Sequence, residues 1–185
     1  MSQFTKKAIE ASFLELLNER PLDKIGIKDI VDRCEINRNT FYYYYRDIYA
    51  LLEEIFREET ETILKAHDPV ESWVDGFLQA IHFALENKRA IYHLYHSSGR
   101  EWVETYMLQL AGHIMMDFVR DRAGSLQVAE SDLQIIVSFY QYALVGMIFE
   151  WVREGMGMDA ERFIRRVGVI FDGNIRHALE NCAKS

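Results

Sequence analysis

Hydrophobic residues recur along the chain at spacings of three and four, which is the period of an α-helix. The first such stretch places Ile9, Phe13, Leu16 and Leu17 on one face and ends at Pro21. No run of four or more residues alternates at the two-residue period of a strand. The chain holds only two prolines, so long segments contain no helix breaker. The pattern predicts an all-α fold of about nine helices.

Capping residues mark the ends of the predicted helices. Gly26 precedes a short apolar segment and Asn37 precedes another, which predicts one helix from about residue 27 and a second over residues 38–44. A further short helix is expected over residues 88–96. Helix starts are also predicted at Asp47, Asp68, Ser98, Ser131 and Asp159, and stops at Gly124 and at residues 155–157.

Residues 27–48 have the layout of a helix-turn-helix, in which two short helices are joined by a tight turn. Ile30 and Val31 can pack against Ile36 and Phe41 and fix the crossing angle of the two helices. The second helix presents guanidinium, amide, hydroxyl and phenol groups, which can contact base edges and phosphate oxygens. The candidate DNA-binding residues are Lys28, Asn37, Arg38, Asn39, Thr40, Tyr42, Tyr43, Tyr44 and Arg46.

The tyrosine run has an alternative interpretation as an aromatic core patch. Successive helical residues are 100° apart, so Tyr42, Tyr43 and Tyr44 cannot all face one core. Phe41 and Tyr45 are four residues apart and are expected to be buried. DNA contact is therefore the favoured interpretation for the segment as a whole.

The charge distribution is compatible with a nucleic-acid partner although the net charge is −8. Residues 1–50 contain eight basic and eight acidic residues, so residues 51–185 carry the whole excess of negative charge. The neutral N-terminal segment can approach phosphate while the acidic remainder of the chain stays away from it. The polar N-terminus resembles no secretory signal, and the two cysteines are too far apart for a disulfide framework, so a cytoplasmic location is expected.

Residues 133–149 carry no formal charge, but this stretch is shorter than the ~20 residues of a typical membrane span. Polar residues interrupt it and charged residues follow it directly. A helix buried in a protein core or in a dimer interface is favoured over a membrane span.

Residues 30–47 (IVDRCEINRNTFYYYYRD) resemble the signature of the TetR/AcrR family of transcription regulators. The resemblance covers residues 5–56 closely and the remainder only through length and helix count. Within the remainder, residues 95–104 resemble a subgroup that includes regulators of dihydroxyacetone kinase operons. The resemblance implies a helix-turn-helix DNA-binding domain over residues 1–47 and a helical effector-binding and dimerisation domain over residues 48–185.

Four positions depart from the family pattern, and one of them, Asn37 in place of the usual N-cap serine, is an equally good cap. Glu35 replaces the turn glycine, so the turn must form without a residue that enters the left-handed region easily. Tyr45 replaces a phenylalanine, and its hydroxyl needs a partner if it is buried. Ile48 replaces a lysine that holds a phosphate in the family, which predicts weaker DNA backbone affinity.

The resemblance implies a small-molecule pocket in the second domain, where large apolar residues fall at helical spacing. Methionine and aromatic side chains can line a pocket with good shape tolerance. Residues of this kind more often form a core, which is the alternative for each of them. The candidate pocket residues are Trp73, Phe77, Tyr92, Tyr95, Trp102, Tyr106, Met107 and Met115.

The last predicted helix carries two apolar stripes, which suits a helix packed both on its own body and on a partner subunit. The family uses its last two helices as a dimer-forming four-helix bundle. The candidate dimer-interface residues are Gly146, Ile164, Gly168, Phe171, Ile175 and Leu179.

The sequence contains no pattern typical of an enzyme. A glycine-rich phosphate loop, a nucleophile elbow and a His-Glu-x-x-His motif are all absent. His93 and His96 have a spacing that metal ligands use, but no third ligand joins them, so neither a metal nor a cofactor is expected.

The expected function is a DNA-binding transcription regulator, more often a repressor than an activator in this family. It would bind a palindromic operator on double-stranded DNA as a homodimer and be released by a small-molecule effector in the second domain. The alternative is a helix-turn-helix protein that acts mainly through a protein co-regulator.

Overall fold

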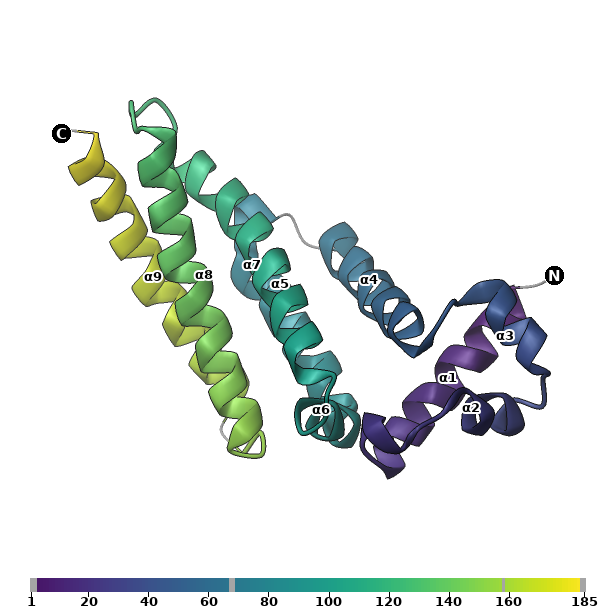
Figure 1. The fold of residues 1–185 in the computed structure, drawn as a ribbon. Helices are drawn as coiled ribbons and strands as arrows, with labels where there is room; N and C mark the ends of the chain where they lie inside the picture. The colour runs from purple at the N-terminus through teal and green to yellow at the C-terminus, as the bar shows by residue number, and fades with distance from the viewer. Residues whose placement is uncertain (1–2, 67–68, 158, 184–185) are drawn as a thin grey trace. The chain divides into compact units, whose positions relative to one another are not determined.

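The fold consists of α-helices and short connections throughout the residues that the structure, a computed structural model, describes: 3–66, 69–157 and 159–183 (Figure 1). Within these ranges there is no strand, which confirms the predicted all-α class. The elements are α1 (Gln3–Glu19), the 3₁₀ turn η1 (Leu22–Lys24), α2 (Ile27–Arg33), α3 (Arg38–Tyr44), α4 (Ile48–Ala66), α5 (Pro69–Glu86), α6 (Lys88–Tyr95), α7 (Arg100–Ala123), α8 (Glu130–Arg153) and α9 (Ala160–Cys182).

The chain forms two compact units. The first comprises Met1–Thr62 and Phe83–Glu101, and the second comprises Ile63–His82 and Trp102–Ser185. Each boundary falls inside a helix, so α4, α5 and α7 all run from one unit into the other. The functional division into residues 1–47 and 48–185 remains a prediction.

The core of the first unit forms around α1. The predicted stripe of Ile9, Phe13, Leu16 and Leu17 is buried, and α1 packs against both α2 and α6. On α6, the Nδ1 atom of His93 lies 2.6 Å from the carbonyl oxygen of Leu17, a hydrogen bond that ties α6 to the C-terminal end of α1. This packing explains why α6 belongs to the same unit as the helix-turn-helix segment.

The core of the second unit contains a cluster of four aromatic rings. Trp73 on α5 stacks on Phe171 of α9 with ring centroids 5.7 Å apart, and Phe171 also meets Tyr140 of α8. Phe118 of α7 contacts Trp73 edge to face. Each of α5, α7, α8 and α9 contributes one ring, so the cluster connects these four helices.

Several predicted helix ends are confirmed and two are wrong. Asn37 and Asp159 cap α3 and α9 through their side chains, and Gly124 ends α7 with a φ of 53°. Ser98 does not cap α7, because its backbone N–H and hydroxyl both donate to Asp23. Helix α8 begins one residue before the predicted Ser131 cap, with Ala129 as its N-cap residue. The predicted cap at Asp68 lies outside the described residues.

Among the described helices, α8 alone is long and apolar enough to cross a membrane by length and composition. Its most apolar 18-residue window has a mean hydropathy of 1.5, and 39% of that window is buried. One side of α8 packs in the second unit, while Ile135, Phe139 and Tyr142 on its other side are exposed. Helix α8 is therefore apolar on two faces, and the chain itself buries only one of them.

Candidate nucleic-acid interface

Helices α2 and α3 form the predicted helix-turn-helix. Ile30 and Val31 on α2 and Phe41 on α3 are buried, so the two short helices share a small apolar interface. The turn is closed by a backbone hydrogen bond of 3.0 Å from the amide of Ile36 to the carbonyl of Val31. A seven-residue helix is too short to be stable alone, so this packing is what holds α3 in place.

Glu35 occupies the turn position where the sequence lacks the expected glycine. Its φ is 54°, which lies in the left-handed region that residues with a Cβ adopt at a cost of about 1–2 kcal/mol. The turn therefore forms with a residue that has a Cβ in the left-handed region, and the chain carries the strain.

Asn37 is the N-cap residue of α3. Its Oδ1 atom accepts hydrogen bonds from the backbone N–H of Thr40 at 2.8 Å and from the Thr40 hydroxyl at 3.1 Å. The cap satisfies one of the N–H groups that have no partner within the helix. It also leaves the Asn37 amide nitrogen available to donate to DNA.

The outward surface of α3 is polar and accessible. Arg38 and Asn39 are exposed at its N-terminal end, and Tyr42 and Tyr43 are 54% and 72% exposed one turn later. Neither Lys28 on α2 nor Arg38 forms an ion pair with any described residue. Arg38, Asn39, Tyr42 and Tyr43 together present positive charge, amide and phenol on one short segment.

Two of the predicted contact residues are partly engaged by the protein itself. The Tyr44 hydroxyl is buried and has no hydrogen-bond partner within the described chain, so it does not reach the surface from which α3 would contact DNA. Arg46 is exposed, and its Nε atom lies 3.2 Å from an oxygen of Asp47. Arg46 thus remains a candidate phosphate contact, whereas the Tyr44 hydroxyl is not exposed for such a contact.

Tyr45, directly after α3, is only 5% exposed and points into the first unit, as predicted. Its hydroxyl donates a hydrogen bond of 2.7 Å to Oε1 of Glu10 on α1. Burial and this hydrogen bond raise the pKa of the Tyr45 phenol far above its usual value. The hydroxyl that the sequence left without a partner is thus satisfied by a carboxylate 35 residues earlier.

Lys6 connects the same carboxylate to α4. Its ammonium group contacts the carboxylates of Glu54 and Glu58 and lies 3.8 Å from Glu10. Burial opposes the charge of Lys6, but the hydrogen bonds to Glu54 and Glu58 outweigh it and raise the pKa. This network was not identified from the sequence. Its signals in the sequence are the four-residue spacings of Lys6 with Glu10 and of Glu54 with Glu58, together with the Tyr45 hydroxyl, which needs a partner.

The predicted pocket residues are distributed over the two units. Trp73, Phe77 and Met115 are buried in the core of the second unit. Tyr92 and Tyr95 belong to the first unit, where Tyr92 is exposed and Tyr95 is buried. The remaining three residues lie half-buried on α7: Trp102, Tyr106 and Met107.

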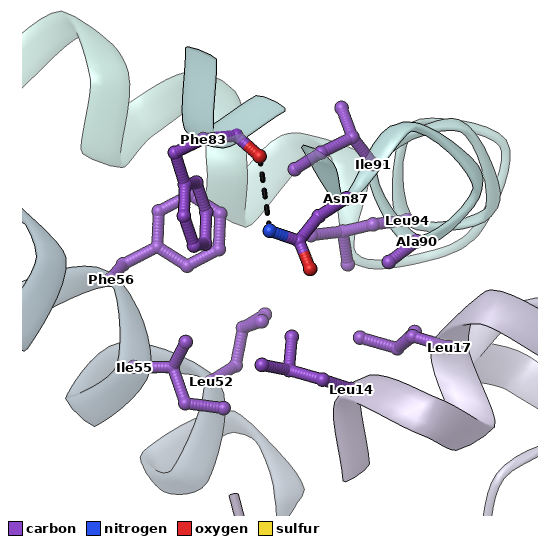
Figure 2. Close-up of a pocket in the computed structure, with 10 residues that line it drawn as sticks. All are labelled: Leu14, Leu17, Leu52, Ile55, Phe56, Phe83, Asn87, Ala90, Ile91 and Leu94. Atoms are coloured by element: carbon purple, nitrogen blue, oxygen red, sulfur yellow. Dashed lines mark hydrogen bonds between the residues drawn. The ribbon is translucent and has the colours of Figure 1, made fainter. Parts of the chain in front are cut away.

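A small cavity lies inside the first unit, between α1, α4, α6 and the end of α5 (Figure 2). The space open to the centre of a water-sized sphere is only about 10 Å³, which is barely enough for one water molecule. Asn87, the one polar residue of its lining, donates to the carbonyl of Phe83 at 3.0 Å. None of the predicted pocket residues lines this cavity: its walls are Leu14, Leu17, Leu52, Ile55, Phe56, Phe83, Asn87, Ala90, Ile91 and Leu94.

Five of the six predicted dimer-interface residues lie in the core of their own unit. Ile164, Gly168, Phe171, Ile175 and Leu179 are buried in a single chain, so they offer no accessible surface to a partner. The exposed apolar residues of α8 and α9 are different ones. They are Ile135, Phe139, Tyr142, Val169 and Ile170, with Gly146 on the exposed side of α8.

The two histidines with metal-ligand spacing have other contacts. His93 bonds to the Leu17 carbonyl, and the His96 ring lies 4.3 Å from that of Tyr92. Among the described residues, no group of three or more His, Cys, Asp or Glu side chains could hold a metal ion.

Comparison with known proteins gives matches over most of the chain. Residues 11–55 match the family described as "Bacterial regulatory proteins, tetR family", and residues 71–173 match "Transcriptional regulator C-terminal region" of TetR type. The HTH-type dhaKLM operon transcriptional activator DhaS of Lactococcus lactis is 26% identical over 87 residues, which are 47% of this chain and 46% of DhaS. The uncharacterized HTH-type transcriptional regulator YxbF of Bacillus subtilis is 26% identical over 66 residues, 36% of this chain and 17% of YxbF.

The aligned segments thus span less than half of either relative. A solved structure of the dihydroxyacetone kinase operon activator DhaS shares the fold, with a TM-score of 0.76 over 95% of this chain and 98% of that one, at 18% identity. The matched relatives are regulators and not enzymes, as the sequence predicted. The two family matches together establish that the chain belongs to the TetR family of DNA-binding transcription regulators.

Proposed function

We propose that this regulator binds a near-palindromic operator as a homodimer, with α3 of each subunit in the major groove. The observation that carries the proposal is the exposed polar surface of α3, where Arg38, Asn39, Tyr42 and Tyr43 project from a helix fixed by the buried Phe41. Arginine reads guanine edges and asparagine reads adenine edges, while phenols donate to phosphates. Two such helices about 34 Å apart would fit successive major grooves.

Dimerisation is proposed through the outer face of α8 and α9, which run side by side (Figure 1). On α8, Ile135, Phe139 and Tyr142 follow one another at spacings of four and three and are each more than 60% exposed. Val169 and Ile170 of α9 are also exposed. Exposed apolar residues of this kind mark a protein interface, and a twofold axis lets the same surface serve both subunits.

An effector is proposed to act by shifting the population of two dimer arrangements that differ in DNA affinity. Trp102 and Tyr106 on α7 support a site for it, because their rings stack with centroids 5.4 Å apart and stay half-buried. A protein co-regulator in place of a small molecule is the alternative that the sequence left open. The regulator is expected to act in the cytoplasm, where it meets the chromosome.

Repression is the proposed sign of regulation, and activation is the second candidate. The specific observation that favours activation is that DhaS, similar to this chain in sequence and in fold, is named an activator. A reporter driven by the promoter of the chain's own operon separates the two. Deleting the gene raises expression if it encodes a repressor and lowers it if it encodes an activator.

The DNA-binding proposal is tested by footprinting on the DNA upstream of the gene. The wild-type protein should protect two half-sites centred about ten base pairs apart, or a multiple of that spacing. Arg38→Ala should lose protection, while Arg176→Ala, which removes an exposed arginine from α9, should keep it. Equal protection by both variants would contradict the assignment of α3 as the reading helix.

A further inference from the structure

Glu10 lies where three elements of the first unit meet. It belongs to α1, its Oε1 atom accepts the hydrogen bond from Tyr45 just after α3, and Lys6 links it to α4 through Glu54 and Glu58. The Glu10 side chain is only 12% exposed. A partly buried carboxylate is unfavourable unless its hydrogen bonds repay the desolvation, so its position needs an explanation.

The hydrogen bond to Tyr45 fixes the C-terminal end of α3. Phe41 holds α3 by apolar packing alone, which is non-directional and tolerates small rotations of the helix. The Tyr45 phenol, by contrast, must point at one carboxylate oxygen to satisfy its buried hydroxyl. Tyr45 also donates its backbone N–H to the Phe41 carbonyl at 2.9 Å, so the orientation of its side chain is transmitted directly to the last turn of α3.

The groups around Glu10 leave its charge poorly compensated. One lysine serves three carboxylates, and Arg57 on α4 is turned to Glu54 and Glu61. Burial raises the pKa of Glu10, and the nearby charges of Glu58 and Glu54 add to this, while the Tyr45 hydrogen bond and Lys6 oppose it. Glu10 therefore takes up a proton at a higher pH than an ordinary glutamate.

We propose that Glu10 and Tyr45 are positioning residues for the DNA-reading helix, and that loss of the Glu10 charge weakens DNA binding. The proposal rests on the DNA-binding function proposed above. An ionised carboxylate is a stronger acceptor than a protonated one, so the charged form of Glu10 holds the Tyr45 hydroxyl more firmly. Acid would loosen the hold on Tyr45 and with it the orientation of Arg38, Asn39 and Tyr43.

This role predicts that stability and DNA affinity change in opposite directions. Because the pKa of Glu10 is raised on folding, its contribution to stability is fully present below the unfolded pKa and is lost as pH rises through the folded value. At neutral pH the ionised Glu10 carboxylate therefore lowers the free energy of unfolding, although the same charge favours the orientation of α3. A residue with a purely structural role would not show this opposition.

The experiment compares Glu10→Gln, Tyr45→Phe and the wild type by DNA anisotropy and thermal unfolding between pH 5 and pH 8. Glu10→Gln keeps an acceptor without the charge. It should melt higher at pH 7.5, bind DNA about threefold more weakly because neutral hydrogen bonds are about half as strong, and lose the affinity decrease in acid. Tyr45→Phe should bind about tenfold more weakly and should also lose the affinity decrease in acid, because it lacks the hydroxyl through which Glu10 acts on α3.

Tyr140→Phe is the matched control, because it removes the same atom from a buried tyrosine on α8 whose hydroxyl makes no hydrogen bond in the described chain. It should leave the affinity and its pH profile unchanged. Hydrogen exchange of the α3 amides, measured without DNA, should show faster exchange in Tyr45→Phe than in Tyr140→Phe.

The outcomes separate this proposal from the DNA-binding function. If Glu10→Gln binds DNA with wild-type affinity and a wild-type pH profile, the positioning role is overturned while DNA binding stands. If the wild type binds no DNA, the function fails, and the exchange of the α3 amides then decides the positioning role alone. Equal exchange in Tyr45→Phe and Tyr140→Phe would overturn it.

Discussion

A methyl group of Val74 fills the space that a side chain at residue 168 would need: a Cβ built on Gly168 would lie 2.5 Å from Cγ2 of Val74. Gly168 is in the middle of α9, where glycine is about 1 kcal/mol less favourable than alanine. The close approach of α5 and α9 within the second unit explains why the chain accepts this cost.

This contact predicts that Gly168→Ala destabilises the protein. The new methyl group forces a shift of Val74, and overpacking of this kind costs about 1–3 kcal/mol. The control is Gly76→Ala on α5, where a Cβ would meet Ile63 at an ordinary 3.5 Å. Urea unfolding should show a lower midpoint for Gly168→Ala and a slightly higher one for Gly76→Ala; a gain in both would contradict the contact.

The left-handed conformation of Glu35 makes its replacement by glycine a stabilising change. Glu35→Gly should raise the free energy of unfolding by about 1 kcal/mol, because glycine adopts positive φ without a steric penalty. Asp32→Gly, three residues earlier and exposed on α2, should instead lower it slightly, by about 0.3 kcal/mol, because glycine is a somewhat poorer helix former than aspartate. Thermal melts of the two variants test this directly, and destabilisation by Glu35→Gly would show that the turn is not strained.

The side-chain cap of α3 predicts a distinctive pair of substitutions at Asn37. Asn37→Ala removes the acceptor for the Thr40 N–H and should lower the free energy of unfolding by about 1 kcal/mol. Asn37→Ser restores an N-cap oxygen and should recover most of that loss. If both variants lose stability equally, the cap does not contribute as the geometry indicates.

The exposed aromatic face of α8 predicts a dimer that one charge can disrupt. Phe139→Asp places a carboxylate at the centre of the proposed interface and should weaken dimerisation about 30-fold, the equivalent of ~2 kcal/mol at a central interface residue. Tyr92→Asp makes the same change at an exposed aromatic residue of α6 and should leave the dimer intact. Sedimentation equilibrium distinguishes the two, and a wild-type protein that is monomeric at micromolar concentration would contradict the proposed interface.

Local physics made much of the fold predictable from the sequence. The bounds of α3 and the cap at Asn37 followed from a polar residue before a short apolar period, and both are confirmed. Gly124 ended α7 as expected because glycine enters the left-handed region freely. The failure at Ser98 has a non-local cause: Ser98 has the spacing of a cap, but it donates its hydrogen bonds to Asp23, which is 75 residues away in the sequence.

The candidate site was predictable only where it lies on one element. The exposed residues of α3 are separated by a few positions, so helical periodicity alone placed them. The partner of Tyr45 was not predictable, because Glu10 is 35 residues away and any buried acceptor would satisfy the phenol. The sequence showed two apolar stripes on α9, but periodicity does not tell which of them packs against the core of the same chain. The structure buries the stripe that contains Ile164 and Leu179.

We propose that the exposed polar surface of α3 binds the DNA duplex. The most direct test is the salt dependence of binding to the DNA upstream of the gene, measured for the wild type and for Arg38→Ala. We expect the logarithm of the wild-type affinity to fall steeply with the logarithm of salt concentration, and Arg38→Ala to bind about 10–100-fold more weakly at each salt concentration. Affinity that is independent of salt and unchanged by Arg38→Ala would contradict the account.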